Sequence, residues 1–476
     1  MELKLNRNVA AYAQGLDDLN VVLREPLSLL TFCRFDLIPK VIYAEDRLGS
    51  RNSKWARDLY LAHIEALNGF VEADESEKIG ADQFLFAFDA LIDSMRRNGF
   101  DARNAVPVTS SGRILDGAHR VAAAIALRKP VPTISVSSAP PHDLSAAALS
   151  CRGMREHVLA TCAAKYAELD SSSRLILVWP AARGEEASLQ RILNKYCDVV
   201  FSRKLRLSRL GRLNIVREAY RGEAWLGSSA DDFIGVKNKA SWCFPSDGDL
   251  RIFLATGSSN WLGLKEEIRD LFAIEKNSVH ITDTANEAVD LCRLLLTKAG
   301  LHYLNNSVPE DYSWFTTLTN HFNAYLARNA YSPNDFCLLG SSVLSAYGVR
   351  EARDLDFVSL AQVSPTGFKE IDHHDGELEH FGLSATEIIC NPDCHFWFGG
   401  HKFLAAEHLK RIKAQRREQK DLRDLDLLKT LENDQIKPRI RPTLTAAHVK
   451  GRVKFYLLWA RFNLRRLTML ARRAHM

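Results

Sequence analysis

The chain has 476 residues, 46% hydrophobic and 25% charged, which is typical of a globular protein of about three domains. Its 63 basic and 58 acidic side chains leave a formal net charge of +5, which argues against nucleic acid as the main partner. The cysteines are scattered and lack the spacing of a zinc site, so we expect reduced thiols. The sequence shows no apolar signal core and no run of 18 apolar residues, so we expect a cytoplasmic protein.

The first predicted unit spans residues 1–140, and its most informative part is the segment 106–136. A strand ends at Leu115, Asp116 is a suitable helix N-cap, and an Ala-rich helix runs to Leu127 before a second strand begins. The pattern therefore predicts a strand, a turn, a helix and another strand.

His119 and Arg120 fall in the first turn of that helix, where the helix dipole and the side-chain charge both favour an anion. The box Asp116-Gly117-Ala118-His119-Arg120 resembles that of the ParB/sulfiredoxin-like fold, over about residues 35–136. The resemblance implies an α+β unit in which Asp116, Gly117, His119 and Arg120 bind nucleotide phosphates. The alternative is a capping Asp116 and a surface His119.

Members of this superfamily include sulfiredoxins, a free-serine kinase and CTP-binding ParB proteins. Ala118 stands where a sulfiredoxin has its reactive cysteine, and neither the Glu-Arg-Arg variant nor the helix-turn-helix of ParB is found. Kinase chemistry needs a carboxylate base. Glu45 and Asp46, after a predicted strand at 40–44, are candidates, although a solvated acidic turn is the favoured interpretation. Apolar helix faces within 55–64 and 84–92 are expected to be core.

Residues 151–310 alternate predicted strands and helices, which is typical of an α/β unit, here of unknown role. A capping box is expected at 284–287. His280, Thr282 and Asp283 cluster at a strand end, where α/β proteins often bind ligands. We favour the simpler interpretation of a core histidine followed by a turn.

The segment 336–358 carries the strongest chemical signal. Gly340-Ser341-Ser342 breaks a short apolar strand and starts a helix, so its backbone N–H groups favour phosphate. Asp354 and Asp356 then alternate with apolar residues, so on a strand both carboxylates project from one face. Two hard oxygen ligands beside a phosphate site suit Mg²⁺.

This pattern resembles the signature of the polymerase-β-like, or minimal, nucleotidyltransferases, over residues 313–433, and a Lys-Asp-Leu-x-Asp-Leu helix at 420–425 matches small members of that family. The resemblance implies a mixed sheet with helices, Mg²⁺ at Asp354 and Asp356, and NTP phosphates at Gly340, Ser341 and Ser342. The family's third carboxylate is assigned to Glu387, in a predicted strand, with Asp393 as the second choice.

Three further features complete the chain. Lys402 is a candidate triphosphate ligand, with capping or solvation as the alternatives. Residues 405–431 read as one long charged helix, with some basic side chains facing the nucleotide. After a linker at 433–445, the tail 446–476 is a basic amphipathic helix suited either to the inner face of a membrane or to docking on protein.

We therefore expect a multidomain α/β and α+β enzyme. It would transfer a nucleoside monophosphate from ATP, CTP or another NTP to a small-molecule or glycan-precursor acceptor, in an Mg²⁺-dependent reaction suited to polysaccharide biosynthesis. An N-terminal ATP-dependent small-molecule kinase would be a second activity. Two alternatives stay open: a toxin or regulator that nucleotidylates RNA or protein, and a non-catalytic ParB-like protein that binds nucleotide or DNA.

Overall fold

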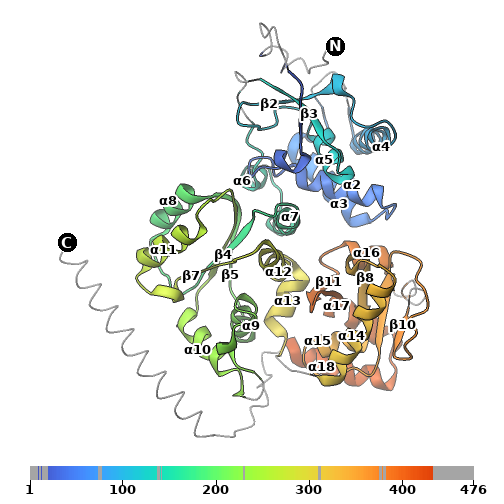
Figure 1. Cartoon of the computed structure of the whole chain (residues 1–476). Coiled ribbons are helices and arrows are strands. Elements are labelled where there is room, and N and C mark those ends of the chain that lie inside the picture. The colour runs from blue at the N-terminus through green and yellow to red at the C-terminus, as the bar shows by residue number, and fades with distance from the viewer. Residues whose placement is uncertain are drawn as a thin grey trace, which may run out of the picture. The chain divides into compact units, whose positions relative to one another are not determined.

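The computed structural model describes residues 9, 12, 20–72, 78–136, 140, 142–228, 231–308, 312–374, 378 and 382–432. The chain divides into two compact units, Met1–Ser171 and Ser172–Met476 (Figure 1). The predicted linker at 433–445 and the predicted basic helix at 446–476 lie outside the described residues. Within the described residues, no helix combines the length and the apolar character that crossing a membrane requires.

The first unit contains a three-stranded sheet with helices packed beside it (Figure 1). The central strand pairs antiparallel with one neighbour and parallel with the other, in the order β1-β3-β2. The strands are β1 (Val22–Arg24), β2 (Val106–Val108) and β3 (Val131–Ser135). The helices are α2 (Leu37–Leu48), α3 (Lys54–Asn68), α4 (Ala81–Asn98), α5 (Ala118–Leu127), α6 (Ala146–Cys151) and α7 (Glu156–Leu169).

The helices of this unit bury the apolar faces that the sequence predicts. Leu59 and Ile64 of α3 and Phe84 and Phe88 of α4 are buried, as expected for core. The strand predicted at 40–44 is wrong, because this segment lies within α2. A short apolar run does not separate a buried strand from a buried helix, and α2 contacts α3, α5 and α7 on several sides.

The second unit begins with a four-stranded sheet in the order β5-β6-β4-β7, in which all neighbours are antiparallel. The strands are β4 (Arg174–Val178), β5 (Asp198–Leu205), β6 (Leu250–Thr256) and β7 (Val279–Ile281). The helices are α8 (Glu186–Tyr196), α9 (Arg209–Ala219), α10 (Ile234–Cys243), α11 (Trp261–Phe272), α12 (Ala285–Leu295) and α13 (Lys298–Asn306). Strands and helices alternate as predicted. A core joins β4 and β7 to α8 and α11.

A five-stranded mixed sheet follows in the order β10-β9-β8-β12-β11. Its strands are β8 (Phe336–Leu339), β9 (Leu355–Ser359), β10 (Ile371–His373), β11 (His395–Phe398) and β12 (His401–Leu404). Its helices are α14 (Ser313–Arg328), α15 (Ser341–Ala346), α16 (Ala385–Cys390), α17 (Ala406–Arg416) and α18 (Gln419–Glu432). The mixed α/β character of the chain is thus as expected.

Local chemistry sets two boundaries of this sheet and its helices. Gly399 and Gly400, both at positive φ, form the two-residue turn of the β11–β12 hairpin. The single helix predicted at 405–431 is instead two, since Arg417 adopts a left-handed conformation at the end of α17. The chain can therefore fold back, and α18 packs against α17.

Candidate functional site

The turn after β8 brings two of the predicted site residues together. Gly340 has φ +62°, and a Cβ built on it would lie 2.5 Å from Oδ2 of Asp356. Glycine is therefore required both by the backbone conformation and by the approach of the carboxylate. Ser341 opens α15 immediately afterwards. Ser342 is buried, and its hydroxyl donates to the carbonyl of Leu339 at 2.6 Å, so this side chain serves the turn.

Asp354 and Asp356 flank this turn. Asp356 lies opposite Leu339 in the antiparallel β8–β9 pair, and its Oδ1 is 3.3 Å from Nε2 of His374. Asp354 immediately precedes β9, and its Oδ1 accepts a hydrogen bond of 2.9 Å from the Ser341 hydroxyl. The intervening Leu355 is fully buried. The predicted alternation of inward apolar and outward acidic side chains is therefore present.

The residue beside this pair is Asp372, which the sequence did not single out. β10 runs parallel to β9 with Asp372 in register with Asp356, and both line the same cavity. Glu387 was expected on a strand, but it lies in the first turn of α16 and is not among the residues that line this cavity. Asp393 accepts a bond from the backbone of Lys298 and is likewise absent from the lining.

The cavity has a volume of about 900 Å³. The acidic side chains of its lining are Asp354, Asp356 and Asp372 at β9 and β10, and Glu418 and Asp424 at α18. The basic side chains come from the α15–β9 loop and from α17 and α18. The basic residues are Arg350, Arg353, Lys413, Arg416, Lys420 and Arg423. A cavity of this size can bury a small ligand. Its basic portion suits an anion such as a polyphosphate.

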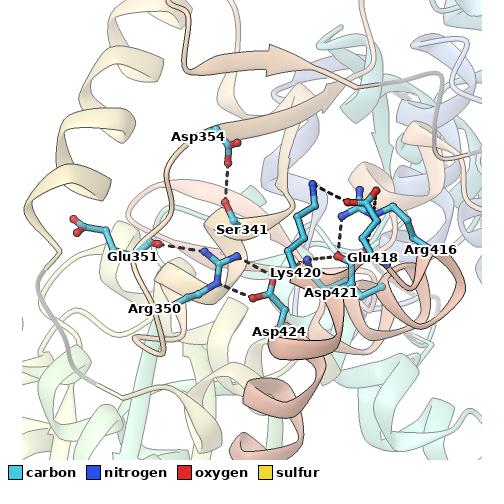
Figure 2. A network of polar contacts seen from close by, with 10 residues as sticks. Ser341, Arg350, Glu351, Asp354, Arg416, Glu418, Lys420, Asp421 and Asp424 are labelled. Atoms are coloured by element: carbon cyan, nitrogen blue, oxygen red, sulfur yellow. Dashed lines mark hydrogen bonds and ion pairs between the residues drawn. The ribbon is translucent and has the colours of Figure 1, made fainter.

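A buried ion network holds α18 in place beside the cavity. Asp421 is fully buried and accepts from Lys413 at 3.1 Å and from Arg416 at 2.8 and 2.9 Å. Asp424 is paired with Lys413 at 2.7 Å and with Arg350 at 2.7 and 2.9 Å. The hydrogen bond from Arg416, aided by Lys413, holds the pKa of Asp421 well below its usual value. Figure 2 shows this network beside the Ser341–Asp354 contact.

The donor set of the cavity suits a divalent cation. Among the described residues, no group of three or more His, Cys, Asp or Glu side chains has an arrangement that could hold a metal ion by itself. Mg²⁺, however, is commonly bound by one or two carboxylates together with substrate phosphates. Asp354 and Asp356 beside a glycine turn match that requirement, and their hard oxygen ligands match the ion.

In the first unit, the predicted box makes mostly internal contacts. Gly117 begins α5 in a left-handed conformation. His119 packs edge-on against Phe88, its Nε2 is 3.0 Å from the Tyr60 hydroxyl, and burial lowers its pKa well below the usual value. Arg120 pairs with Asp116 at 3.1 Å and donates to a backbone carbonyl. A phosphate-binding role for the box stays a prediction.

The candidate kinase bases are also engaged internally. Glu45 forms an ion pair with Lys165 at 2.7 Å, and the carboxylate of Asp46 accepts from the backbone N–H of Ser53. Both lie on α2 rather than after a strand. The contacts of these two residues therefore favour structural roles.

Sequence reasoning missed a buried charge network in this unit. Asp36 receives a two-pronged contact from Arg34 at 2.8 and 2.9 Å and a third bond from Lys40 at 3.1 Å. Lys40 also contacts Nε2 of His63 at 2.9 Å. At most 3% of each residue is exposed. Burial alone would raise the pKa of Asp36, but Arg34 and Lys40 outweigh it and hold that pKa well below its usual value.

His280, Thr282 and Asp283 in the middle sheet make the contacts expected of a core histidine followed by a turn. His280 packs edge-on against Tyr220, and burial lowers its pKa to about 3. The hydroxyl of Thr282 accepts from the backbone N–H of Leu175, while Asp283 pairs with Lys265 at the surface. Thr284 caps α12 as expected, because its hydroxyl accepts from the N–H of Glu287, while the Glu287 carboxylate accepts from the N–H of Asp283 rather than from that of Thr284.

Lys402, the predicted triphosphate ligand, points elsewhere. Its ammonium donates to the carbonyls of Asn334 and Ile389 at 2.7 and 2.8 Å, and it is not among the residues that line the cavity. Four of the basic side chains that do line the cavity, Lys413, Arg416, Lys420 and Arg423, lie in the charged helical segment. Their charge was visible in the sequence, but their direction depends on the break at Arg417.

Comparisons of the chain with protein-family models, with curated proteins and with solved structures found no match.

Proposed function

We propose that the chain is an Mg²⁺-dependent nucleotidyltransferase that transfers a nucleoside monophosphate from an NTP to a small-molecule or glycan-precursor acceptor. The observation that carries this proposal is that Asp354 and Asp356 both lie beside the Gly340–Ser341 turn, in a cavity that also has a basic portion. Asp372, in register with Asp356, is the third carboxylate that we assign to the site.

Each group would have a distinct role. Gly340 lets the backbone approach a phosphate closely, and Ser341 orients Asp354 through its hydroxyl. Asp354 and Asp356 would hold the cation, with Asp372 beside them. Bound Mg²⁺ would neutralise charge on the transferring phosphoryl group. Arg353, Lys420 and Arg423 line the cavity outside the network of Asp421 and Asp424, and they would bind the remaining phosphates and so orient the NTP for in-line attack by the acceptor oxygen.

The first unit adds no second activity to this proposal, because the contacts of the candidate bases favour structural roles. The two alternative functions expected from the sequence differ in their acceptor. A toxin or regulator would modify RNA or protein, and a nucleotide- or DNA-binding protein would have no acceptor. A cavity of about 900 Å³ supports the small-molecule acceptor.

The test is turnover of each of the four NTPs, labelled at the α-phosphate, by the full chain with Mg²⁺ and a panel of hydroxylated acceptors. We expect pyrophosphate release with at least one NTP and loss of at least 100-fold in Asp356→Asn. Asp426→Asn is the matched control, because Asp426 lies on the exposed side of α18 and pairs with Lys429. Equal turnover by Asp356→Asn and the wild type would contradict the proposal.

A further inference from the structure

In the loop between α15 and β9, each of the four residues 350–353 that precede Asp354 makes a hydrogen bond to a neighbouring element. The hydroxyl of Ser345 donates to the carbonyl of Arg350 at 2.9 Å and accepts from the backbone N–H of Ala352 at 2.6 Å. One buried serine thus fixes two points of the loop. Asp354 follows two residues later, so small changes in the loop would alter where its carboxylate lies.

α14 fixes the same loop from another direction. The backbone N–H of Trp314 donates to Oε1 of Glu351 at 2.8 Å, and the Trp314 indole N–H donates to the carbonyl of Arg353 at 3.1 Å. Glu351 therefore supplies a bond that the first turn of the helix lacks. The indole bond holds the residue that directly precedes Asp354.

The third attachment comes from α18. Arg350 makes two parallel bonds to Asp424, of 2.7 Å from Nε and 2.9 Å from Nη2, and Figure 2 shows Arg350 between Glu351 and Asp424. Such a two-pronged contact fixes the orientation of the guanidinium as well as its distance. Asp424 is itself 4% exposed in its side chain and bound by Lys413, so it is a rigid anchor.

We propose that Asp424 is a positioning residue, which acts through Arg350 to keep Asp354 beside Ser341 and ready to hold a divalent cation. This rests on the proposed function. The Asp354 carboxylate is exposed, and within the described part of the chain its hydrogen bond is the one that it accepts from Ser341. Its direction therefore depends on the backbone, which the loop contacts hold in place before any ligand binds.

The chain offers a close control. Asp421 belongs to the same buried network and binds Lys413 as Asp424 does, but its carboxylate otherwise accepts from Arg416 and from the backbone N–H of Glu418, and not from Arg350. Asp424→Asn and Asp421→Asn each remove one buried negative charge next to Lys413. Both variants weaken the docking of α18, whereas Asp424→Asn alone weakens the contact that fixes the loop.

Two measurements on the full chain test the role. The first is the dissociation constant of Mn²⁺, followed by electron paramagnetic resonance, and the second is hydrogen exchange of the amides at 351–355. For Asp424→Asn we expect a dissociation constant raised at least about tenfold and faster exchange in the loop, since partners that hold metal ligands in place typically have effects of this size. For Asp421→Asn we expect less than about a third of that change.

Trp314→Phe is the second variant, because it keeps the ring and removes only the bond to the carbonyl of Arg353. A shift in the same direction is expected without any change at α18. Equal Mn²⁺ affinity in Asp424→Asn and Asp421→Asn, with intact binding by the wild type, would overturn the positioning role alone. Failure of the wild type to bind Mn²⁺ would overturn the proposed function and the positioning role together.

Discussion

Replacement of Asp36 by Asn should destabilise the first unit severely. Asp36 is 1% exposed and is the carboxylate that receives Arg34 and Lys40, whose charges are also buried. Asn keeps the shape of the side chain and removes its charge, so both cations would remain buried without an anion. Breaking a buried ion pair by removing one partner costs about 3–5 kcal/mol. We expect the loss for this variant to reach the upper part of that range, since two cations depend on one carboxylate.

The loss is measured by urea-dependent hydrogen exchange of the α2 and α5 amides, which reports on this unit within the full chain. Asp58→Asn is the matched control, because the Lys54–Asp58 pair is also an i,i+4 contact but is well exposed. Exposed pairs contribute about 0–1 kcal/mol, so the control should unfold almost as the wild type does. A difference between Asp36→Asn and the control below about 1 kcal/mol would refute the reasoning.

Three further predictions follow from single positions. Burial, with the neighbouring Lys40, lowers the pKa of His63 well below its usual value, so the folded unit keeps this ring neutral while the unfolded chain takes up a proton below about pH 6.5. Stability of the first unit, followed by chemical denaturation, should fall by about 1.4 kcal/mol per pH unit from this ring as the pH drops below 6.5, and His63→Gln should reduce the measured slope by that amount. Gly340→Ala should lose nucleotide turnover and about 1–3 kcal/mol of stability, measured by thermal unfolding, because of its positive φ and the adjacent carboxylate. Asp372→Asn should lose Mg²⁺-dependent turnover at least tenfold, while Glu387→Gln should stay within about twofold of the wild type.

The predictable part of the site is the part that is local in sequence. Gly340 breaks an apolar strand, and Asp354 and Asp356 alternate with buried residues, so a few neighbouring positions define the turn and the acidic face. The turn at Gly399–Gly400 is equally local, because two glycines at positive φ stand between the paired strands β11 and β12. In each case the deciding interactions lie within one strand or one turn.

Asp372 and Glu387 show why the third carboxylate that we propose differs from the one expected from the sequence. β10 has three residues, which is too short for a period of two to stand out, and Asp372 joins the site only through its register with β9. The segment around Glu387 is apolar and β-branched enough to suggest a strand. Ser384 nevertheless caps a helix there, since its hydroxyl accepts from the N–H of Glu387. The side-chain cap at Ser384 therefore outweighed the strand propensity of the six residues that form α16.

The basic side chains of α17 and α18 pair with some acidic residues and not with others. The structure, and not the sequence, therefore distinguishes acids with a structural role from candidate catalytic acids. Asp421 and Asp424 are three residues apart on one helix and are buried against Lys413 and other cations, so their charges are already compensated. In the described part of the chain no Lys or Arg pairs with Asp354 or Asp372, and Asp356 contacts His374, although basic side chains line the same cavity. Acids that a fold leaves uncompensated beside a glycine turn have their charge available for a cation from solution. For this reason we propose Asp354 and Asp356, and not the acids of the Lys-Asp-Leu-x-Asp-Leu helix, as the metal ligands.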